Sequence, residues 1–256
     1  MKHLILFCLS AVLLTGCMTE NTLNGYSQSK LDEILVTKDL ADEGHYGVCK
    51  FYVPPEKRIE DRLPLVIYFE DEKPNDGANS IIEYVDKENN PAIVLIVPYG
   101  TNDYERALIS QGVEDYVTSK LRTTEFAIHP HQIYVTGFGA GGMEAWKFAT
   151  ENTGWVATVA TVCSGPPSGK VYNEPEVPVV MTEMNIWAVQ YVDDPIVNND
   201  YFKKVVTAIW TQNLSMCRFT EFFEGGHTTA PFKQRAFLDW MFGTRLSHGI
   251  SGVENK

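Results

Sequence analysis

The sequence predicts an α/β fold, with three layers built around a mostly parallel sheet. Residues 65–69 (LVIYF) and 92–97 (AIVLIV) are continuous apolar runs of strand length. Runs without a polar face are typical of strands that are buried on both sides. Strand-like and helix-like segments then alternate to the end of the chain, and no linker divides them. This alternation favours a single domain over residues 46–245, with a short tail at 246–256.

Each expected strand is a short run of β-branched, aromatic or aliphatic residues. The first run is ended by Pro54 and Pro55, which cannot donate to a strand ladder. The expected strands cover residues 48–53, 65–69, 92–97, 133–136, 156–162, 186–190 and 219–223.

The expected helices lie between these strands. A short helix around residues 81–85 follows the second strand, and a longer helix over 108–121 follows the third. The longer segment places Leu108, Val113, Tyr116, Val117 and Leu121 on its inward face. Further helices are expected over residues 141–150, 201–212 and 232–242, and the Pro- and Gly-rich stretch 164–178 is expected to be a loop.

The amino-terminal segment has the pattern of a secretion signal. A basic residue, Lys2, precedes an apolar run over residues 4–14, which is too short to span a bilayer. The sequence Leu-Thr-Gly-Cys that ends at Cys17 resembles the lipobox of bacterial lipoproteins, although an ordinary signal peptide remains the alternative. The resemblance implies cleavage after residue 16, a lipid on Cys17, and a tether and lead-in over residues 17–45. The lipid would anchor the domain to the bacterial cell envelope, at the outer membrane or the extracytoplasmic face of the cell membrane.

Composition excludes several classes of function. With 21 basic and 33 acidic residues the formal charge is −12, which disfavours binding to nucleic acid or anionic lipid headgroups. Five cysteines are too few for a disulfide scaffold, and Cys49, Cys163 and Cys217 allow at most one bond within the domain. The chain has no CxxC pair and no HExxH helix, so no metal or cofactor is expected.

A glycine-rich turn carries the strongest functional signal. Residues 128–142 read IHPHQIYVTGFGAGG, with a strand before the glycines and a helix after them. The segment resembles the nucleophile elbow of the α/β-hydrolase superfamily, and most of all secreted esterases such as feruloyl esterases, polyhydroxybutyrate depolymerases and carboxylesterases. The resemblance implies an α/β-hydrolase fold with little or no lid. Gly139 stands at the nucleophile position, between Gly137 and Gly141.

Chain order places the other two catalytic positions of the resembled family. In the stretch IWAVQYVDDPIV the family's acid position matches Asp194, with Asp193 as the neighbouring alternative. In FFEGGH the base position matches His227. Without the resemblance, Asp194 is a turn residue before a proline and His227 is a loop histidine.

Two departures from the family pattern argue against serine chemistry. Glycine at position 139 has no atom that can attack a carbonyl. The family's "HG" dipeptide after the first buried strand is replaced by Glu70 and Asp71, beside the oxyanion position that also includes Ala140. A carboxylate there would repel a developing oxyanion.

The sequence therefore favours an esterase-related pseudoenzyme that acts as a binding or scaffold module. The pocket that binds substrate in the resembled esterases could hold a small acyl, aromatic or carbohydrate ligand here. One alternative is an active carboxylic-ester hydrolase, with acyl, feruloyl or polyester substrates, that uses another nucleophile or an activated water. A purely structural envelope lipoprotein is the third interpretation.

Overall fold

The computed structural model describes residues 22–55, 62–87, 90–121, 128–165, 184–197, 199–212 and 217–246. The signal segment, Cys17, most of the 164–178 loop and most of the tail lie outside these residues. Among the described residues, no helix is long and apolar enough to cross a membrane.

An eight-stranded sheet forms the middle layer, in the order β1-β2-β4-β3-β5-β6-β7-β8. The pairs that involve β1 and β2 are antiparallel, and all pairs from β4 through β8 are parallel. The strands are β1 (Val36–Asp39), β2 (Val48–Tyr52), β3 (Leu63–Phe69), β4 (Ile93–Val97), β5 (Ile128–Phe138), β6 (Thr158–Val162), β7 (Asn185–Tyr191) and β8 (Cys217–Phe222).

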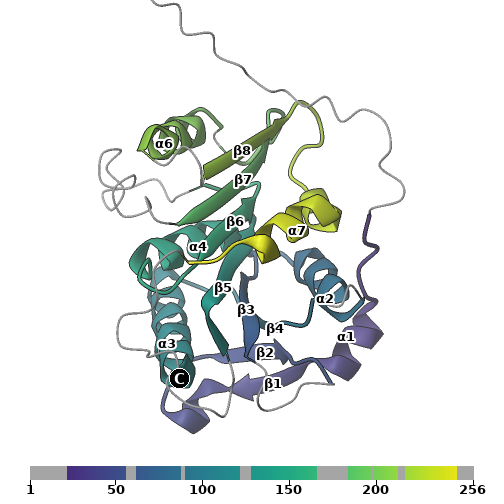
Figure 1. The fold of residues 1–256 in the computed structure, drawn as a ribbon, viewed down its shortest axis with the longest axis vertical. Coiled ribbons are helices and arrows are strands. Elements are labelled where there is room, and N and C mark those ends of the chain that lie inside the picture. The colour runs from purple at the N-terminus through teal and green to yellow at the C-terminus, as the bar shows by residue number, and fades with distance from the viewer. Residues whose placement is uncertain are drawn as a thin grey trace, which may run out of the picture.

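Helices cover both faces of this sheet (Figure 1). One face carries α3 (Asp103–Leu121), α4 (Gly139–Glu151) and α6 (Asn199–Gln212). The other carries α1 (Gln28–Ile34), α2 (Gly77–Lys87) and α7 (Arg235–Gly243). The expectation of a three-layer α/β fold with a mostly parallel sheet is confirmed.

The strand residues divide between two hydrophobic cores, one under each helix layer. Along β3, Leu65, Ile67 and Phe69 join the core beneath α3, α4 and α6. Val66 and Tyr68 point to the opposite core, beneath α1, α2 and α7. This two-residue alternation, with both faces apolar, is why the sequence of β3 reads as an uninterrupted hydrophobic run.

The lead-in from residue 22 onward belongs to the folded domain, which corrects the expected boundary at residue 46. Strand β1 pairs with β2 along its whole length. Leu31 of α1 is buried, and so is Leu40 of the short 3-10 helix η1 (Leu40–Glu43). Isolated leucines in a polar stretch give little periodicity, so the sequence pattern indicates a tether over these residues. In the structure they form an edge strand instead.

Two helices also differ from expectation in detail. Helix α3 begins at Asp103, and it buries Ile109 where the sequence pattern favours Leu108. The expected helix over residues 232–242 is divided into the 3-10 helix η2 (Ala230–Lys233) and α7, with extended backbone at Gln234 between them.

Candidate active site

The glycine-rich turn joins β5 to α4 at the carboxyl end of the parallel sheet. Phe138 ends β5 in an extended conformation, and Gly139 opens α4 with φ +55°. This left-handed backbone is costly for residues with a side chain and free for glycine. The turn therefore has the strand–turn–helix form of a nucleophile elbow, with glycine at its apex.

The carboxylate of Asp71 lies against this apex. A Cβ atom built on Gly139 would lie 2.9 Å from Asp71 Oδ1 and 3.1 Å from Oδ2. Asp71 Oδ1 also accepts a hydrogen bond of 2.8 Å from the backbone N–H of Ala140. In serine hydrolases with this elbow, the amide after the nucleophile stabilises the oxyanion. Here that amide holds an internal carboxylate.

The first turn of α4 gains a hydrogen-bond acceptor from this contact. Phe138, at the N-cap position, makes no side-chain hydrogen bond to the helix. Asp71 supplies a carboxylate there from a distant strand end, and a negative charge is stabilised at a helix N-terminus. The resulting interaction ties the end of β3 to α4.

Gly141 explains how the end of β3 comes so close to the helix. A Cβ atom on this residue would lie 2.3 Å from the carbonyl oxygen of Phe69 and 2.4 Å from that of Glu70. Only glycine permits this approach of two backbones. The third glycine of the elbow therefore sets the position of Asp71.

His227 and Asp194 meet at the ends of β7 and β8. His227 Nδ1 lies 2.9 Å from Asp194 Oδ2 and 3.2 Å from Oδ1. The Asp194 side chain is fully buried, and its Oδ1 accepts hydrogen bonds from the backbone N–H groups of Ile196 and Val197. These amides fix the carboxylate, and the carboxylate orients the imidazole, as an acid–base pair requires.

Asp193, the alternative acid, has a different role. Its carboxylate accepts hydrogen bonds from the backbone N–H groups of Gly225 and Gly226, at 3.1 and 2.8 Å. These two bonds lower the pKa of Asp193. Asp193 thus holds the loop that carries His227, whereas Asp194 contacts the imidazole itself.

Other contacts fix the His227 loop in place. The imidazole packs on the ring of Phe138, with 4.4 Å between ring centroids. Asp76, in the loop that also carries Asp71, accepts a hydrogen bond from the hydroxyl of Thr229 and forms a 2.6 Å ion pair with Lys233. The two loops that bring Asp71 and His227 to the site are therefore joined to each other.

Cys163 completes the site from the end of β6. Its backbone φ of +50° is the one positive value found for a non-glycine residue in the described part of the chain. Its thiol lies 3.5 Å from the carbonyl oxygen of Thr228, and burial raises its pKa to about 12. A neutral buried thiol is a poor nucleophile. Cys49 and Cys217 are also buried and free, and neither forms a disulfide.

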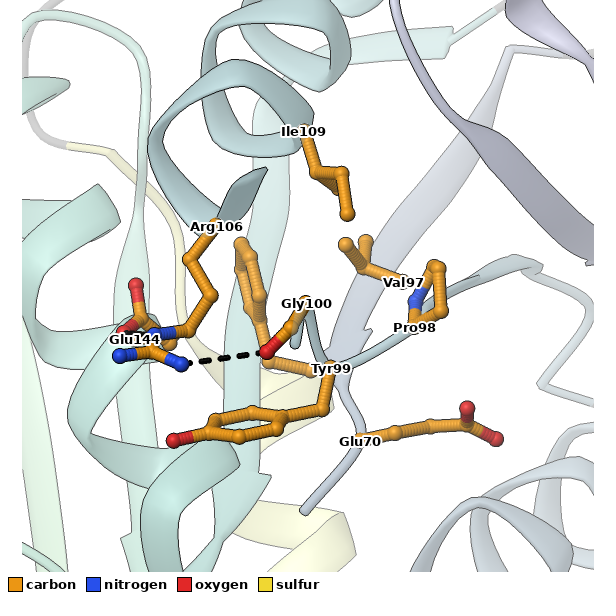
Figure 2. Close-up of a pocket in the computed structure, with 9 residues that line it drawn as sticks. Glu70, Val97, Pro98, Tyr99, Gly100, Arg106, Ile109 and Glu144 are labelled. Atoms are coloured by element: carbon orange, nitrogen blue, oxygen red, sulfur yellow. Dashed lines mark hydrogen bonds and ion pairs between the residues drawn. The ribbon is translucent and has the colours of Figure 1, made fainter. Parts of the chain in front are cut away.

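Glu70 does not share the position of Asp71. It lines a small recess between the ends of β3 and β4 and helices α3 and α4 (Figure 2). Arg106 fills the polar side of this recess: it donates to the carbonyl of Gly100 at 3.1 Å, and pairs with Glu144 at 3.3 Å. Arg106 thus provides a hydrogen-bond donor to the Gly100 carbonyl and a charge partner to Glu144. The recess is separate from the contact between Asp71 and the elbow.

The structure brings Gly139, Ala140 and Asp71 together, it pairs Asp194 with His227 beside Phe138, and it places Glu70 in the neighbouring recess. Cys163, which follows an expected strand, lies within 4.8 Å of both Asp194 and His227 through its possible ligand atoms. The three residues belong to three separate loops, so no fixed sequence spacing relates them. Only the order of the parallel strands brings them together.

No protein-family model matches the chain, and no curated protein matches it. Solved structures do. A thermostable esterase superposes with a TM-score of 0.66 at 17% identity, over 82% of this chain, which spans 62% of that esterase. A putative dienelactone hydrolase from Klebsiella pneumoniae gives 0.61 at 14% identity, over 82% of this chain and 98% of that one. A mutant feruloyl esterase module from Clostridium thermocellum, complexed with sinapinate, gives 0.60 at 12% identity, over 93% and 98%. The chain therefore has the α/β-hydrolase fold that these esterases and hydrolases share.

Proposed function

We propose that this protein is an esterase-related pseudoenzyme that acts as a ligand-binding or scaffold module. The observation that carries the proposal is the contact of Asp71 with the elbow. The carboxylate fills the space beside Gly139 and occupies the amide of Ala140. The elbow thus lacks a nucleophile, and the amide that would stabilise an oxyanion already binds a negative charge. Serine-type ester cleavage requires a nucleophile and a free oxyanion-stabilising amide, and this site offers neither.

The same contact favours uncharged ligands. A ligand that carries a carboxylate would meet the negative charge of Asp71 where an esterase binds its oxyanion. Neutral acyl, aromatic or carbohydrate groups meet no such repulsion. Methyl ferulate, as a neutral aromatic ester, is therefore a better first probe than ferulate.

Turnover of p-nitrophenyl acyl and feruloyl esters tests the proposal. We expect the full chain, purified in detergent, to hydrolyse these esters no faster than its His227→Ala variant. A serine hydrolase loses roughly 2 × 10⁶-fold in turnover without its nucleophile, and what remains comes from its oxyanion hole and substrate binding. Here Asp71 occupies the Ala140 amide, so we expect rates near the buffer rate. A clear wild-type rate that disappears in His227→Ala would overturn the proposal.

An active hydrolase is the second candidate, and the intact His227–Asp194 pair favours it. The buried carboxylate orients the imidazole as it would in a working acid–base pair. Such an enzyme would use the imidazole to activate a water molecule. The ester experiment separates the two candidates, because only the hydrolase loses a rate when His227 is replaced.

Anchoring at the cell envelope is also proposed, through a lipid on Cys17. The lipobox-like sequence that ends at this cysteine supports the proposal. We expect Cys17→Ser to abolish incorporation of a labelled fatty acid and to move the protein from the membrane fraction to the soluble fraction. Cys49→Ser, which changes a buried thiol of the domain, should leave both unchanged. Unchanged labelling of Cys17→Ser would contradict the assignment.

A further inference from the structure

Three potential metal ligands of different chemistry meet at the carboxyl ends of adjacent strands. Cys163 follows β6, Asp194 follows β7 and His227 follows β8. One possible ligand atom from each residue lies within 4.8 Å of the other two. The sulfur, carboxylate oxygen and ring nitrogen are the three ligand types that zinc takes in proteins.

The carboxylate is held ready for such a role. Its Oδ1 accepts from the backbone amides of Ile196 and Val197, so that the direction of the carboxylate is set by the protein. Its Oδ2 lies 2.9 Å from His227 Nδ1. Two ligands of a tetrahedral zinc ion, at roughly 2.0 Å from the metal, lie about 3.3 Å apart. The nitrogen–oxygen pair therefore needs little movement to share a metal ion.

Cys163 reaches the pair through an unusual backbone. Its φ of +50° is a conformation that costs a non-glycine residue free energy, and residues in such conformations cluster at functional sites. Its thiol donates to the carbonyl oxygens of Thr228 at 3.5 Å and Gly226 at 3.8 Å, and it also interacts with the Asp194 carboxylate. The sulfur therefore already lies beside the carboxylate and the imidazole with which it would share a metal ion.

Charge balance favours a divalent ion here. A thiolate, a carboxylate and a neutral imidazole carry two negative charges, which a single Zn²⁺ neutralises. Burial of charge is costly unless the charge is paired, and Asp194 is fully buried. The zinc complex would carry no net charge.

We propose that Cys163, Asp194 and His227 bind one zinc-like divalent ion, with the fourth coordination position open. The inference rests on the proposed function, because it names the metal ion as a ligand of the same module. Zinc replaces the thiol proton of Cys163, which is released to solvent. The imidazole stays neutral because its proton moves from Nδ1, which binds the metal, to Nε2, and no oxidation takes place. Loss of the serine removes the group that the His227–Asp194 pair would otherwise activate.

Zinc titration of the chelator-treated full chain, followed by calorimetry, tests the site. We expect one equivalent to bind to the wild type, and about 100-fold or more weaker binding to Cys163→Ala and to His227→Ala. Cys217→Ala is the matched control, since it removes another buried free thiol and should bind as the wild type does. Cobalt gives a second readout, because a thiolate–cobalt charge-transfer band should appear in the wild type and disappear in Cys163→Ala.

The outcomes separate this site from the proposed function. Absence of saturable zinc binding, or binding that Cys163→Ala leaves unchanged, would overturn the metal site while ester turnover remains absent. Ester turnover in the chelator-treated wild type that is lost in His227→Ala would overturn the proposed function, whatever the zinc result. Circular dichroism checks that each variant is folded, and Cys163→Ser replaces the alanine variant if the latter unfolds.

Discussion

The double variant Gly139→Ser, Asp71→Ala is expected to hydrolyse p-nitrophenyl esters, whereas Gly139→Ser alone stays at least about 100-fold slower. Serine supplies the missing nucleophile, and His227 with Asp194 supplies a base that is already oriented. The single variant still has the Asp71 carboxylate on the Ala140 amide. Loss of one oxyanion donor costs roughly 10²–10³ in turnover. Here the donor, the Ala140 amide, already binds a carboxylate whose negative charge would repel the oxyanion.

Two matched variants control this experiment. Asp71→Asn combined with Gly139→Ser keeps an oxygen that can accept from Ala140, and we expect it to stay slow. Glu72→Ala combined with Gly139→Ser removes an adjacent exposed carboxylate and should also stay slow. Equal rates for Gly139→Ser with and without Asp71→Ala would mean that Asp71 does not block the site.

Gly141→Ala is expected to lower the free energy of unfolding by about 2–3 kcal/mol. The new methyl group would lie within 2.4 Å of two backbone carbonyl oxygens, those of Phe69 and Glu70. Backbone atoms at the end of a buried strand cannot move aside as a flexible side chain can, and such overpacking is destabilising. Denaturant unfolding, followed by tryptophan fluorescence, measures the change.

Gly154→Ala is the control for this variant. No atom lies within 4 Å of a Cβ built on Gly154, so its unfolding free energy should change by less than about 0.5 kcal/mol. If Gly141→Ala is as stable as the control, the close approach of β3 to α4 is not required by the fold. The position of Asp71 would then need another explanation.

The parts of the candidate site that lie in one continuous stretch of sequence were the easiest to predict. The elbow is a continuous sequence in which strand, glycines and helix follow one another, and it could be found from residues 128–142 alone. Asp194 and His227 were placed by chain order, and their contact at 2.9 Å follows from neighbouring parallel strands. Glu70 and Asp71 are adjacent in sequence, yet only Asp71 contacts the elbow, because the two side chains leave the strand end in different directions.

By itself, the sequence determined the three-layer fold, the mostly parallel sheet and the absence of a nucleophile at Gly139. These depend on hydrophobic runs and on single residue identities, which need no long-range contact to be recognised. Tertiary structure alone decided that Asp71 occupies the Ala140 amide, that the lead-in contributes β1, and that Cys163 joins Asp194 and His227. The Asp71 and Cys163 contacts join segments far apart in the chain, and β1 pairs with β2 across the intervening η1 turn. Such contacts depend on strand order and backbone approach, for which no local pattern of residues provides a signal.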